Sequence, residues 1–482
     1  MPYLRAGLVI TLNVFIYLLT FGRVLWLEGR VIRGIFRNWL GGHRYRPRRF
    51  LRPETEEEIV ALIAGEERLR VCGSGHSFNS AIVSDGALVS LDRYRGLLWV
   101  DPANKQMAVK GGTRVRELNK LLAEQGLAFA ALPSHDAQSI AGIISTDVHG
   151  TGRDWGFVSQ SVVSLKLITG SGEVIHCEPE DDLFCAAIGG IGAAGIIVEV
   201  VVQGVDRFNV RQRVEIRDLA EVEANLDQLI RENDHLSLYV FPFSGRCQVN
   251  TWNRTTREQS FLGPQREFAT TAIDALLVTW IGNLISFVGL LPRVSRFVLS
   301  TRRTTDLVLE SYKAFNRTIY PPHQELEAAV PYEDTFALTH RLVELYEEMY
   351  PSGLPYTVIE LRFTPAGHRR TLIGAGRDRR STWIDLLTND MPGYERYFAA
   401  AAEILREAGA RPHLGKFPLG IDHSYLARAH GDNFNKFQAL VREHDPSAKF
   451  ANLFTRQHFG GAAPATVRHT ATSGGEARPR AA

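Results

Sequence analysis

The sequence predicts an α+β protein of two lobes, preceded by an N-terminal membrane helix. The chain has 482 residues, too many for one hydrophobic core of ordinary size, so two lobes are expected. Short helices and strands are mixed throughout residues 50–206, and the pattern changes at about residue 207. A separate apolar run near the N-terminus predicts the membrane helix.

Charge and cysteine content limit the possible functions. The formal net charge is +2, so no bulk positive field argues for a nucleic-acid partner. The four cysteines are scattered and form no C-x-x-C pair, so neither a disulfide framework nor a zinc site is expected.

Residues 1–30 are expected to be a single-pass transmembrane anchor. Leu8–Leu27 reads LVITLNVFIYLLTFGRVLWL, close to the about 20 apolar residues that span a bilayer. Arginines are dense in the basic linker that follows, residues 31–49, which places the catalytic body in the cytoplasm and Trp39 at the lipid interface. Two alternatives stay open. One is a cleaved signal peptide, although no A-x-A-like site follows, and the other is an interfacial helix, which Arg23 favours slightly.

Periodicity predicts the elements of both lobes. In residues 50–206 we expect helices at Glu56–Glu67, Val115–Gly126 and Asp182–Ala187, with strands at Leu69–Cys72, Ala87–Leu91, Leu97–Val100, Gln106–Lys110, Val162–Thr169 and Gly195–Gln203. In residues 207–430 we expect strands Phe208–Ile216 and Leu236–Val240 around a helix at Leu219–Glu232. The tail, residues 460–482, is rich in Ala, Thr, Gly and Pro and is expected to be disordered.

The most informative stretch is the turn that follows the predicted strand Leu69–Cys72. Glycine permits positive φ and close approach, so such a loop can direct backbone N–H groups toward an anion such as a pyrophosphate. An ordinary turn between strands explains the stretch equally well when it is taken alone. The residues of the turn are Gly73, Ser74, Gly75, His76 and Ser77.

This turn resembles the phosphate-binding loop of the FAD flavoproteins of the vanillyl-alcohol-oxidase, or p-cresol-methylhydroxylase (PCMH), type. GSGHSFN is similar to the loop of the aldonolactone (arabinono-1,4-lactone) oxidase and alditol oxidase subfamily. The resemblance, which extends from about Pro47 to Phe459, implies a PCMH-type FAD-binding domain at residues 50–206 and a cap (substrate) domain at residues 207–430. In that subfamily the histidine carries the flavin on its 8α-methyl group, which implies covalent FAD at His76.

A second run, Ser139–Gly152 with the preceding Pro133 and Ser134, resembles the segment that lines the isoalloxazine in this family. The run contains no cysteine, so at most one covalent flavin bond is expected. A lone histidine is most often structural, and no catalytic role is assigned to the one here. The resemblance implies cofactor contacts from Pro133, Ser134, Gly142, Ser145, Thr146, His149 and Gly150.

Gly189–Gly195 contains a literal G-x-G-x-x-G. A dinucleotide-binding fingerprint for NAD requires a strand before the glycines and a helix after them. Here the predicted order is reversed, so NAD is rejected. The run instead resembles the adenine-side segment of the FAD family, which implies contacts from Gly192, Gly195 and Ile197.

Glu360 and Arg362 share one face of a predicted strand. Spacing alone favours a surface ion pair of little energetic value. The Glu-x-Arg pair nevertheless resembles the pair that meets substrate hydroxyls in alditol oxidases. Arg411–Lys416, RPHLGK, resembles the family's R-P-H-x-G-K motif, with Leu414 where the family usually has Trp. That departure puts the shape of the substrate pocket in question.

These polar residues suggest catalytic roles. Hydride transfer to flavin N5 leaves negative charge near N1–C2=O, and a fixed cation there, for which Lys416 is the candidate, stabilises it. Arg362 would hold the substrate oxygen, and Glu360 would accept a hydrogen bond from a neighbouring hydroxyl. The three together argue against a non-catalytic membrane protein. Asp445–Phe454 resembles the family's D-P-x-x-x-F-x-N run, so residues 431–459 are expected to return to the FAD domain.

The expected function is FAD-linked oxidation of a hydroxyl-bearing carbon in a sugar lactone or polyol, with oxygen as acceptor. Pro133 occupies the position that gates oxygen in the family and gives weak support for an oxidase. The alternative is a membrane dehydrogenase that acts on a lipid-linked sugar and passes electrons to quinone. The mainly apolar segment Leu276–Leu291 bears on this choice: its 16 residues are short for a span, so a second membrane contact and a buried cap helix are equally supported.

Overall fold

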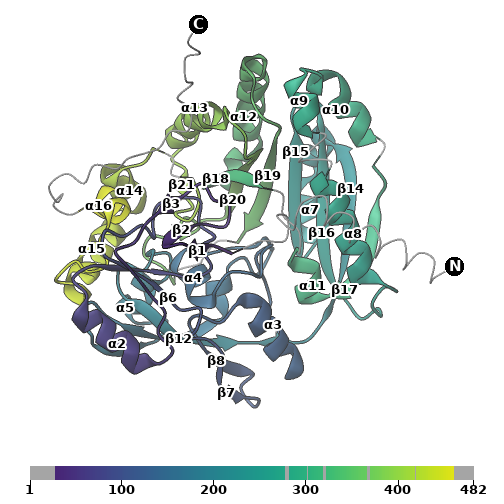
Figure 1. Ribbon diagram of the computed structural model, residues 1–482. Helices are drawn as coiled ribbons and strands as arrows, with labels where there is room; N and C mark the ends of the chain where they lie inside the picture. Colours follow the sequence, from purple (N-terminus) through teal and green to yellow (C-terminus); the bar gives the residue numbers. More distant parts are fainter. Residues whose placement is uncertain are drawn as a thin grey trace, which may run out of the picture.

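The computed structural model describes residues 28–276, 282–300, 302–317, 322–365, 370–417 and 420–460. These residues form two lobes, with a long antiparallel sheet that runs from the right of Figure 1 to its centre. The apolar run at residues 8–27 and the tail from residue 461 lie outside the described residues. Within the described ranges, no helix is long and apolar enough to cross a membrane.

Strands of the first lobe form two sheets. A parallel sheet has the order β4-β6-β5, and an antiparallel sheet has the order β11-β10-β12-β8-β7. The short strands β9 (Leu127–Ala128) and β13 (Val205–Asp206) pair separately. The strands of the two sheets are β4 (Arg49–Leu51), β5 (Leu69–Cys72), β6 (Ala87–Ser90), β7 (Leu97–Asp101), β8 (Gln106–Lys110), β10 (Val162–Ile168), β11 (Val174–Cys177) and β12 (Ile196–Gln203).

Four helices complete the first lobe: α2 (Glu56–Gly65), α3 (Val115–Glu124), α4 (Ile140–Ser145) and α5 (Asp182–Ala187). The first begins where the sequence predicts, because the hydroxyl of Thr55 accepts a hydrogen bond from the Glu58 N–H at 3.2 Å. Around Gly189–Gly195 the order is helix α5, loop, strand β12, opposite to the order that an NAD fingerprint needs.

The second lobe is built on an eight-stranded antiparallel sheet with the order β17-β14-β16-β15-β19-β20-β18-β21. Helices α12 and α13 pack on each other and against β18 and β20 (Figure 1). The strands are β14 (Asn209–Asp218), β15 (His235–Phe241), β16 (Arg246–Thr255), β17 (Thr305–Glu310), β18 (His323–Pro331), β19 (Thr357–Thr364), β20 (Ser381–Asn389) and β21 (Arg411–Pro412). The helices are α6 (Leu219–Ala224), α7 (Leu226–Glu232), α8 (Gly263–Leu276), α9 (Asn283–Phe287), α10 (Leu291–Ser300), α11 (Ser311–Phe315), α12 (Thr335–Met349) and α13 (Tyr394–Glu407).

The helix expected at Leu219–Glu232 is divided into α6 and α7 at Asn225. The Asn225 side chain donates to the Glu221 carbonyl at 2.7 Å, and its backbone leaves helical geometry with φ −119° and ψ 14°. An asparagine amide competes in this way with the regular helical bonds.

Residues 31–49 are folded and do not form the linker expected from their charge. Three short strands, β1 (Arg30–Ile32), β2 (Ile35–Arg37) and β3 (Arg44–Tyr45), make a sheet whose flanks bind the glycine-rich turn. Gly29 N–H donates to the Ser74 carbonyl at 2.6 Å, and Trp39 N–H donates to the Gly75 carbonyl at 3.0 Å. The Trp39 indole, which was expected at a lipid interface, stacks on the His76 ring with a centroid distance of 4.9 Å.

The apolar segment Leu276–Leu291 is not one continuous helix. Helix α8 is described as far as Leu276, and α9 and α10 lie on either side of a turn at Gly289, where φ is +72°. Ser286 is buried and its hydroxyl donates to the Leu354 carbonyl at 2.9 Å, while Phe287 is exposed. The expectation of one buried cap helix is therefore wrong, because the segment contains a turn and has both buried and exposed side chains.

The C-terminal segment contributes α14 (His423–His430), α15 (Asp432–His444) and α16 (Leu453–Phe459), and it packs on the first lobe. Leu69 N–H donates to the Lys449 carbonyl at 2.9 Å. Arg70, which is 3% exposed, donates to the carbonyls of Ala81 and Phe450 at 2.9 and 2.8 Å, and to that of Ile191 at 2.5 Å. One buried guanidinium therefore joins the start of the first lobe, the Gly189–Gly195 run and the C-terminal segment.

Replacing this guanidinium should destabilise the protein strongly. Arg70→Met leaves three buried carbonyls without their charged donor, so the free energy of unfolding should fall by about 3 kcal/mol or more. Arg68→Met is the matched control, because Arg68 is 43% exposed and pairs with Asp85 at the surface, where a loss below about 1 kcal/mol is expected. Urea unfolding measures both, and equal stability of the two variants would contradict the role given to Arg70.

Candidate active site

A cavity of about 660 Å³ lies where the two lobes meet, within the size range of small-molecule and cofactor sites. The first lobe contributes its glycine-rich runs, and the second lobe contributes charged side chains from the eight-stranded sheet. The cavity is lined by nearly all of the predicted site residues: Gly73, Ser74, Gly75, His76, Ser77, Pro133, Ser134, Gly142, Ser145, Thr146, His149, Gly192, Gly195, Ile197, Glu360, Arg362 and Lys416.

Gly150 is the predicted site residue that does not line the cavity. A Cβ built on Gly150 would lie 2.5 Å from the Leu132 carbonyl oxygen, so the residue is glycine for close backbone packing. Its own carbonyl accepts a hydrogen bond from His149 Nδ1 at 2.8 Å. Gly150 therefore contributes to the site by orienting the His149 ring, which does line the cavity.

The turn after β5 makes very close contacts with its surroundings. A Cβ on Gly73 would lie 2.2 Å from Ser139 Oγ, and Gly75 has φ +67°, with its Cβ position 2.9 Å from the Gly29 Cα. Ser139 is the N-cap of α4, where its hydroxyl accepts from the Gly142 N–H at 3.2 Å. Gly73 is required because the turn lies directly on the start of α4, and Gly75 is required because it has a positive φ and packs against Gly29.

His76 lies at the wall of the cavity among other rings. It stacks on the indole of Trp39 with a centroid distance of 4.9 Å and an interplanar angle of 13°, and the His135 ring is 4.1 Å away. Trp39 and His135 also line the cavity, and neither was assigned to the site from the sequence. This packing fixes the plane of the His76 ring.

The charged side of the site is centred on Glu327, which is 0% exposed. Its carboxylate contacts the guanidinium of Arg362, and Arg362 Nη2 is also 3.2 Å from Asp385 Oδ2. Arg362 Nε lies 3.8 Å from Glu360 Oε2. Three neighbouring strands, β18, β19 and β20, thus place one cation among three carboxyl groups, so the pair Glu360–Arg362 is not the surface ion pair that spacing alone favours.

The protonation states follow from burial and charge. Burial raises the pKa of Glu327, but Arg362 and then His149 outweigh burial and lower it to about 2. Burial lowers the pKa of Arg362, and Glu327 and Glu360 more than reverse this and raise it. Burial and the charge of Glu327 both raise the pKa of Asp385 well above its ordinary value, which favours the neutral acid. Glu327 is therefore the buried carboxylate that contacts the guanidinium directly, and Glu360 lies beside it at 3.8 Å.

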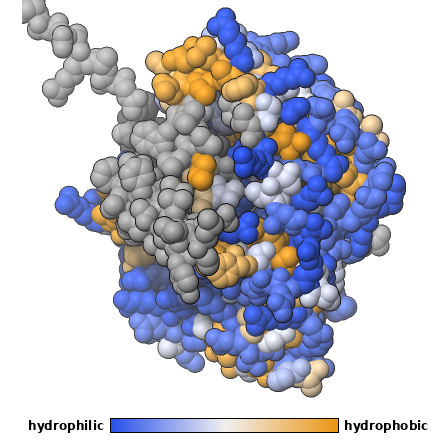
Figure 2. All heavy atoms as spheres, turned by 90° about the vertical axis from the view of Figure 1, so that its right-hand side faces the viewer, coloured by the Kyte–Doolittle hydropathy of each residue, from blue (hydrophilic) through white to orange (hydrophobic). Residues whose placement is uncertain are grey.

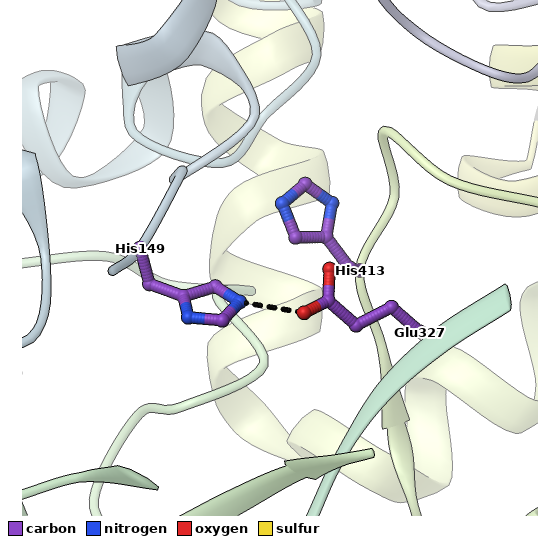
Figure 3. A group of neighbouring side chains, drawn as sticks. All are labelled: His149, Glu327 and His413. Atoms are coloured by element: carbon purple, nitrogen blue, oxygen red, sulfur yellow. Dashed lines mark hydrogen bonds and ion pairs between the residues drawn. The ribbon is translucent and has the colours of Figure 1, made fainter. Parts of the chain in front are cut away.

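His149, Glu327 and His413 meet beneath this group (Figure 3). His149 Nε2 lies 3.0 Å from Glu327 Oε1 and its ring stacks on Trp383 at a centroid distance of 3.6 Å. Both ring nitrogens of His149 face acceptors, the Gly150 carbonyl and Glu327, and a neutral ring can donate to only one. Burial lowers the pKa of His149 to about 4, so near neutral pH the ring is uncharged and donates to one of these two acceptors.

These three side chains are also of types that ligate metals. His413 Nδ1 accepts from the Gly415 N–H at 3.0 Å, so its Nε2 carries the proton and is not a free ligand atom. Arg362 and Lys416 already place positive charge beside Glu327. Hydrogen bonds and ion pairs account for the group without a metal ion.

Lys416 is positioned by strand pairing and by the first lobe. His413 N–H donates to the Glu327 carbonyl at 3.0 Å, which holds the RPHLGK run along β18. From the other lobe, Asn79 Nδ2 donates to the carbonyls of Leu414 and Lys416 at 2.6 and 2.8 Å. The ammonium contacts Glu325 and lies 3.7 Å from Glu327 Oε2.

Burial lowers the pKa of Lys416 to about 7, while its contact with Glu325 favours the charged form. Glu325, Glu327 and Asn79 were not identified from the sequence. The signal for the two glutamates was present, since they alternate with Leu326 and Ala328 in strand β18 and therefore share one face of it. Asn79 is part of the GSGHSFN run, but its role could not be predicted, because its partners lie more than 300 residues away.

Comparison with known proteins agrees with this architecture. A family model described as D-arabinono-1,4-lactone oxidase matches residues 200–458, and one described as FAD binding domain matches residues 47–178. The chain is 29% identical over 432 residues to L-gulono-1,4-lactone dehydrogenase of Mycobacterium tuberculosis, covering 88% of this chain and 99% of the relative. It is 26% identical over 445 residues to L-gulonolactone oxidase of Bos taurus, covering 88% and 98%. A cholesterol oxidase from Brevibacterium sterolicum superposes with a TM-score of 0.70 at 14% identity, covering 90% and 98%, a likeness of fold alone.

Glu327 and Asp385 should respond very differently to amide substitution. Glu327→Gln removes the carboxylate that balances Arg362 and should lower the free energy of unfolding by about 3–5 kcal/mol. Asp385→Asn replaces a group whose raised pKa keeps it neutral, so a loss of about 1 kcal/mol or less is expected.

The dependence of the free energy of unfolding on pH, below neutral pH, provides a second test. Since the folded pKa of Glu327 is lowered, its stabilisation is present above the unfolded pKa, about 4.5, and is lost as pH falls toward about 2. Denaturation at several pH values should show this component in the parent protein and not in Glu327→Gln. Equal losses in the two amide variants would contradict the assigned protonation states.

Proposed function

The chain belongs to the D-arabinono-1,4-lactone oxidase family, and on that basis we propose that it oxidises a hydroxyl-bearing carbon of a sugar lactone with FAD as its cofactor. The observation that carries this proposal is a buried cationic group, Arg362 and Lys416 held by Glu327 and Glu325, opposite the glycine-rich turn in one cavity. A polyol is the alternative substrate class, since it offers the same hydroxyl chemistry.

The cavity fits FAD in its lining and its size. Close packing at Gly73 and Gly75 brings backbone to the cavity wall, as a pyrophosphate requires, and small residues cover the flanking surface. When bound there, FAD supplies the hydride acceptor at N5. The residues that would hold it are Gly73, Ser74, Gly75, His76, Ser77, Ser145, Thr146, Gly192, Gly195, Ile197 and Lys416.

Three side chains of the cap domain would then have separate roles in substrate binding and hydride transfer. Arg362 is fixed between Glu327 and Asp385, so its guanidinium is preorganised to bind the substrate oxygen and to favour loss of the hydroxyl proton. Glu360 lies beside it, with room to accept a hydrogen bond from a neighbouring hydroxyl. Lys416 places positive charge where negative charge develops during hydride transfer.

We also propose that His76 carries the flavin covalently, as in the alditol oxidase subfamily that its turn resembles. In support, the ring lines the cavity and its plane is held by Trp39. Pre-set orientation lowers the entropic cost of bringing a ring nitrogen to a fixed position on a bound ligand.

The segment Pro133–Ser134, expected to control the access of oxygen, is held in place by the cap domain. Asn316 Nδ2 donates to the Pro133 carbonyl at 2.7 Å, and Arg317 N–H donates to the Ser134 carbonyl at 2.7 Å. We favour oxygen as the acceptor and a membrane anchor within residues 8–27, with the catalytic body in the cytoplasm. Transfer of electrons to a quinone is the alternative.

Acid denaturation tests the covalent bond. Yellow colour should stay with the denatured polypeptide of the parent protein and should be released from His76→Ala, because that variant lacks the attaching nitrogen. His135→Ala is the matched control, since this ring lies 4.1 Å from His76, and it should retain the colour. Flavin that is freed from the parent protein by acid would refute covalent attachment at His76.

Steady-state assays on a panel of aldonolactones and polyols test the substrate and the acceptor. Arg362→Lys loses the planar guanidinium, whose Nη2 contacts both Glu327 and Asp385, so kcat/KM should fall by about 10²–10³-fold on the best substrate. Peroxide should form in proportion to substrate. Turnover with a soluble quinone and no peroxide would replace oxygen by quinone, and turnover of no aldonolactone would refute the proposed substrate class.

A further inference from the structure

The helices α9 and α10 form a wall of the cavity with two different faces. On the inner side, Ile285, Leu291 and Leu299 line the cavity. On the outer side, Phe287 is 84% exposed, Phe297 70% and Leu284 62%. Leu291, Ser295 and Leu299 are buried at a spacing of four, whereas Arg293, Arg296, Phe297 and Ser300 are exposed on the other face of the same helix.

This exposed surface, which we call the α9–α10 face, is both apolar and basic. Its apolar members are Leu284, Phe287, Val288, Leu290 and Phe297. Figure 2 shows hydrophobic atoms gathered at the top of this side of the molecule, where Figure 1 places α9 and α10. The sequence from Gly282 to Thr304 contains four arginines, Arg293, Arg296, Arg302 and Arg303, and no acidic residue.

Single exposed apolar residues are common, but phenylalanines this exposed at a helix turn, flanked by arginines, need an explanation. Phe287 and Phe297 cannot turn into the core, because Ile285, Leu291 and Leu299 already occupy the inner side of these helices. A protein partner with an acidic, apolar surface and a bilayer with anionic headgroups both match the chemistry. The bilayer is favoured, because α9 and α10 lie at the top end of the molecule in Figure 1, and the exposed Arg293 and Arg296 lie in the sequence between the exposed Phe287 and Phe297, a mixture of apolar and basic side chains typical of interfacial helices.

We propose that the α9–α10 face docks on an anionic lipid bilayer. Phe287, Val288 and Phe297 enter the headgroup–acyl boundary, and Arg293 and Arg296 bind lipid phosphates. Because the inner side of the same helices lines the cavity, docking brings one wall of the active site to the membrane surface. The docking residues lie outside the catalytic group, so docking and lactone oxidation fail independently of each other.

The test uses the full-length chain with an environment-sensitive NBD dye at Phe287→Cys. A Cys185→Ser background removes the one partly exposed native thiol, the other three cysteines being buried. Vesicles of phosphatidylcholine, with and without phosphatidylglycerol, carry bromine on their acyl chains as quencher. The matched control places the dye at Trp99→Cys, an exposed aromatic position on β7 at the opposite end of the molecule (Figure 1).

Quenching of the dye at position 287 by phosphatidylglycerol vesicles, with little quenching at position 99, is the expected result. Arg293→Glu with Arg296→Glu should weaken vesicle binding at position 287 by about tenfold or more, since each arginine near an anionic surface contributes about fivefold. This double variant should keep the unfolding midpoint and the parent rate of lactone oxidation with a soluble acceptor.

Other results would overturn the proposal. Equal quenching at positions 287 and 99 would mean that another segment tethers the protein without docking this face. A blue-shifted emission at position 287 without vesicles would mean that protein covers the face: a second copy if the shift depends on concentration, another segment of the chain if it does not. Absence of quenching at position 287 would exclude lipid contact.

Discussion

The arrangement of the site depends on one buried carboxylate, that of Glu327. A charge without exposure to water is costly unless it is paired and hydrogen-bonded, and Glu327 meets this requirement with Arg362 from β19, Lys416 from the run after β21 and His149 from the first lobe. Each of those side chains is in turn held in place by Glu327. The group is therefore rigid because its parts neutralise one another, and the two lobes share it.

Much of this architecture is visible in the sequence, because it depends on local patterns. The turn at Gly73–Ser77, the helix–loop–strand order around Gly189–Gly195 and the Glu360–Arg362 face each follow from spacing and from residue type, and the structure brings these segments to one cavity. The roles of Glu327 and Asn79 did not emerge, because their contacts join strands and loops far apart in the chain. Local periodicity contains no information about such partners.

Charge and hydropathy were misleading where solvent-facing side chains dominate the composition. The arginines of residues 31–49 suggested a linker, yet most of them are exposed while Phe36, Asn38 and Leu40 are buried, and the backbone between them binds the glycine-rich turn. In Leu276–Leu291, the apolar run is divided between cavity wall and outer surface. A hydropathy average cannot distinguish those two faces, whereas helical periodicity within α10 does.

The hydrogen bonds of Arg70 and Leu69 have a consequence for biosynthesis. Strand β5 begins at Leu69 and leads into the glycine-rich turn, but its partners include the carbonyls of Lys449 and Phe450. During translation, the chain emerges from the ribosome with its N-terminal part first, so these partners are missing until almost the whole polypeptide has been made. The first lobe therefore cannot close as an independent unit on the ribosome, and a nascent chain must wait for its last helices before the cofactor loop acquires its final support.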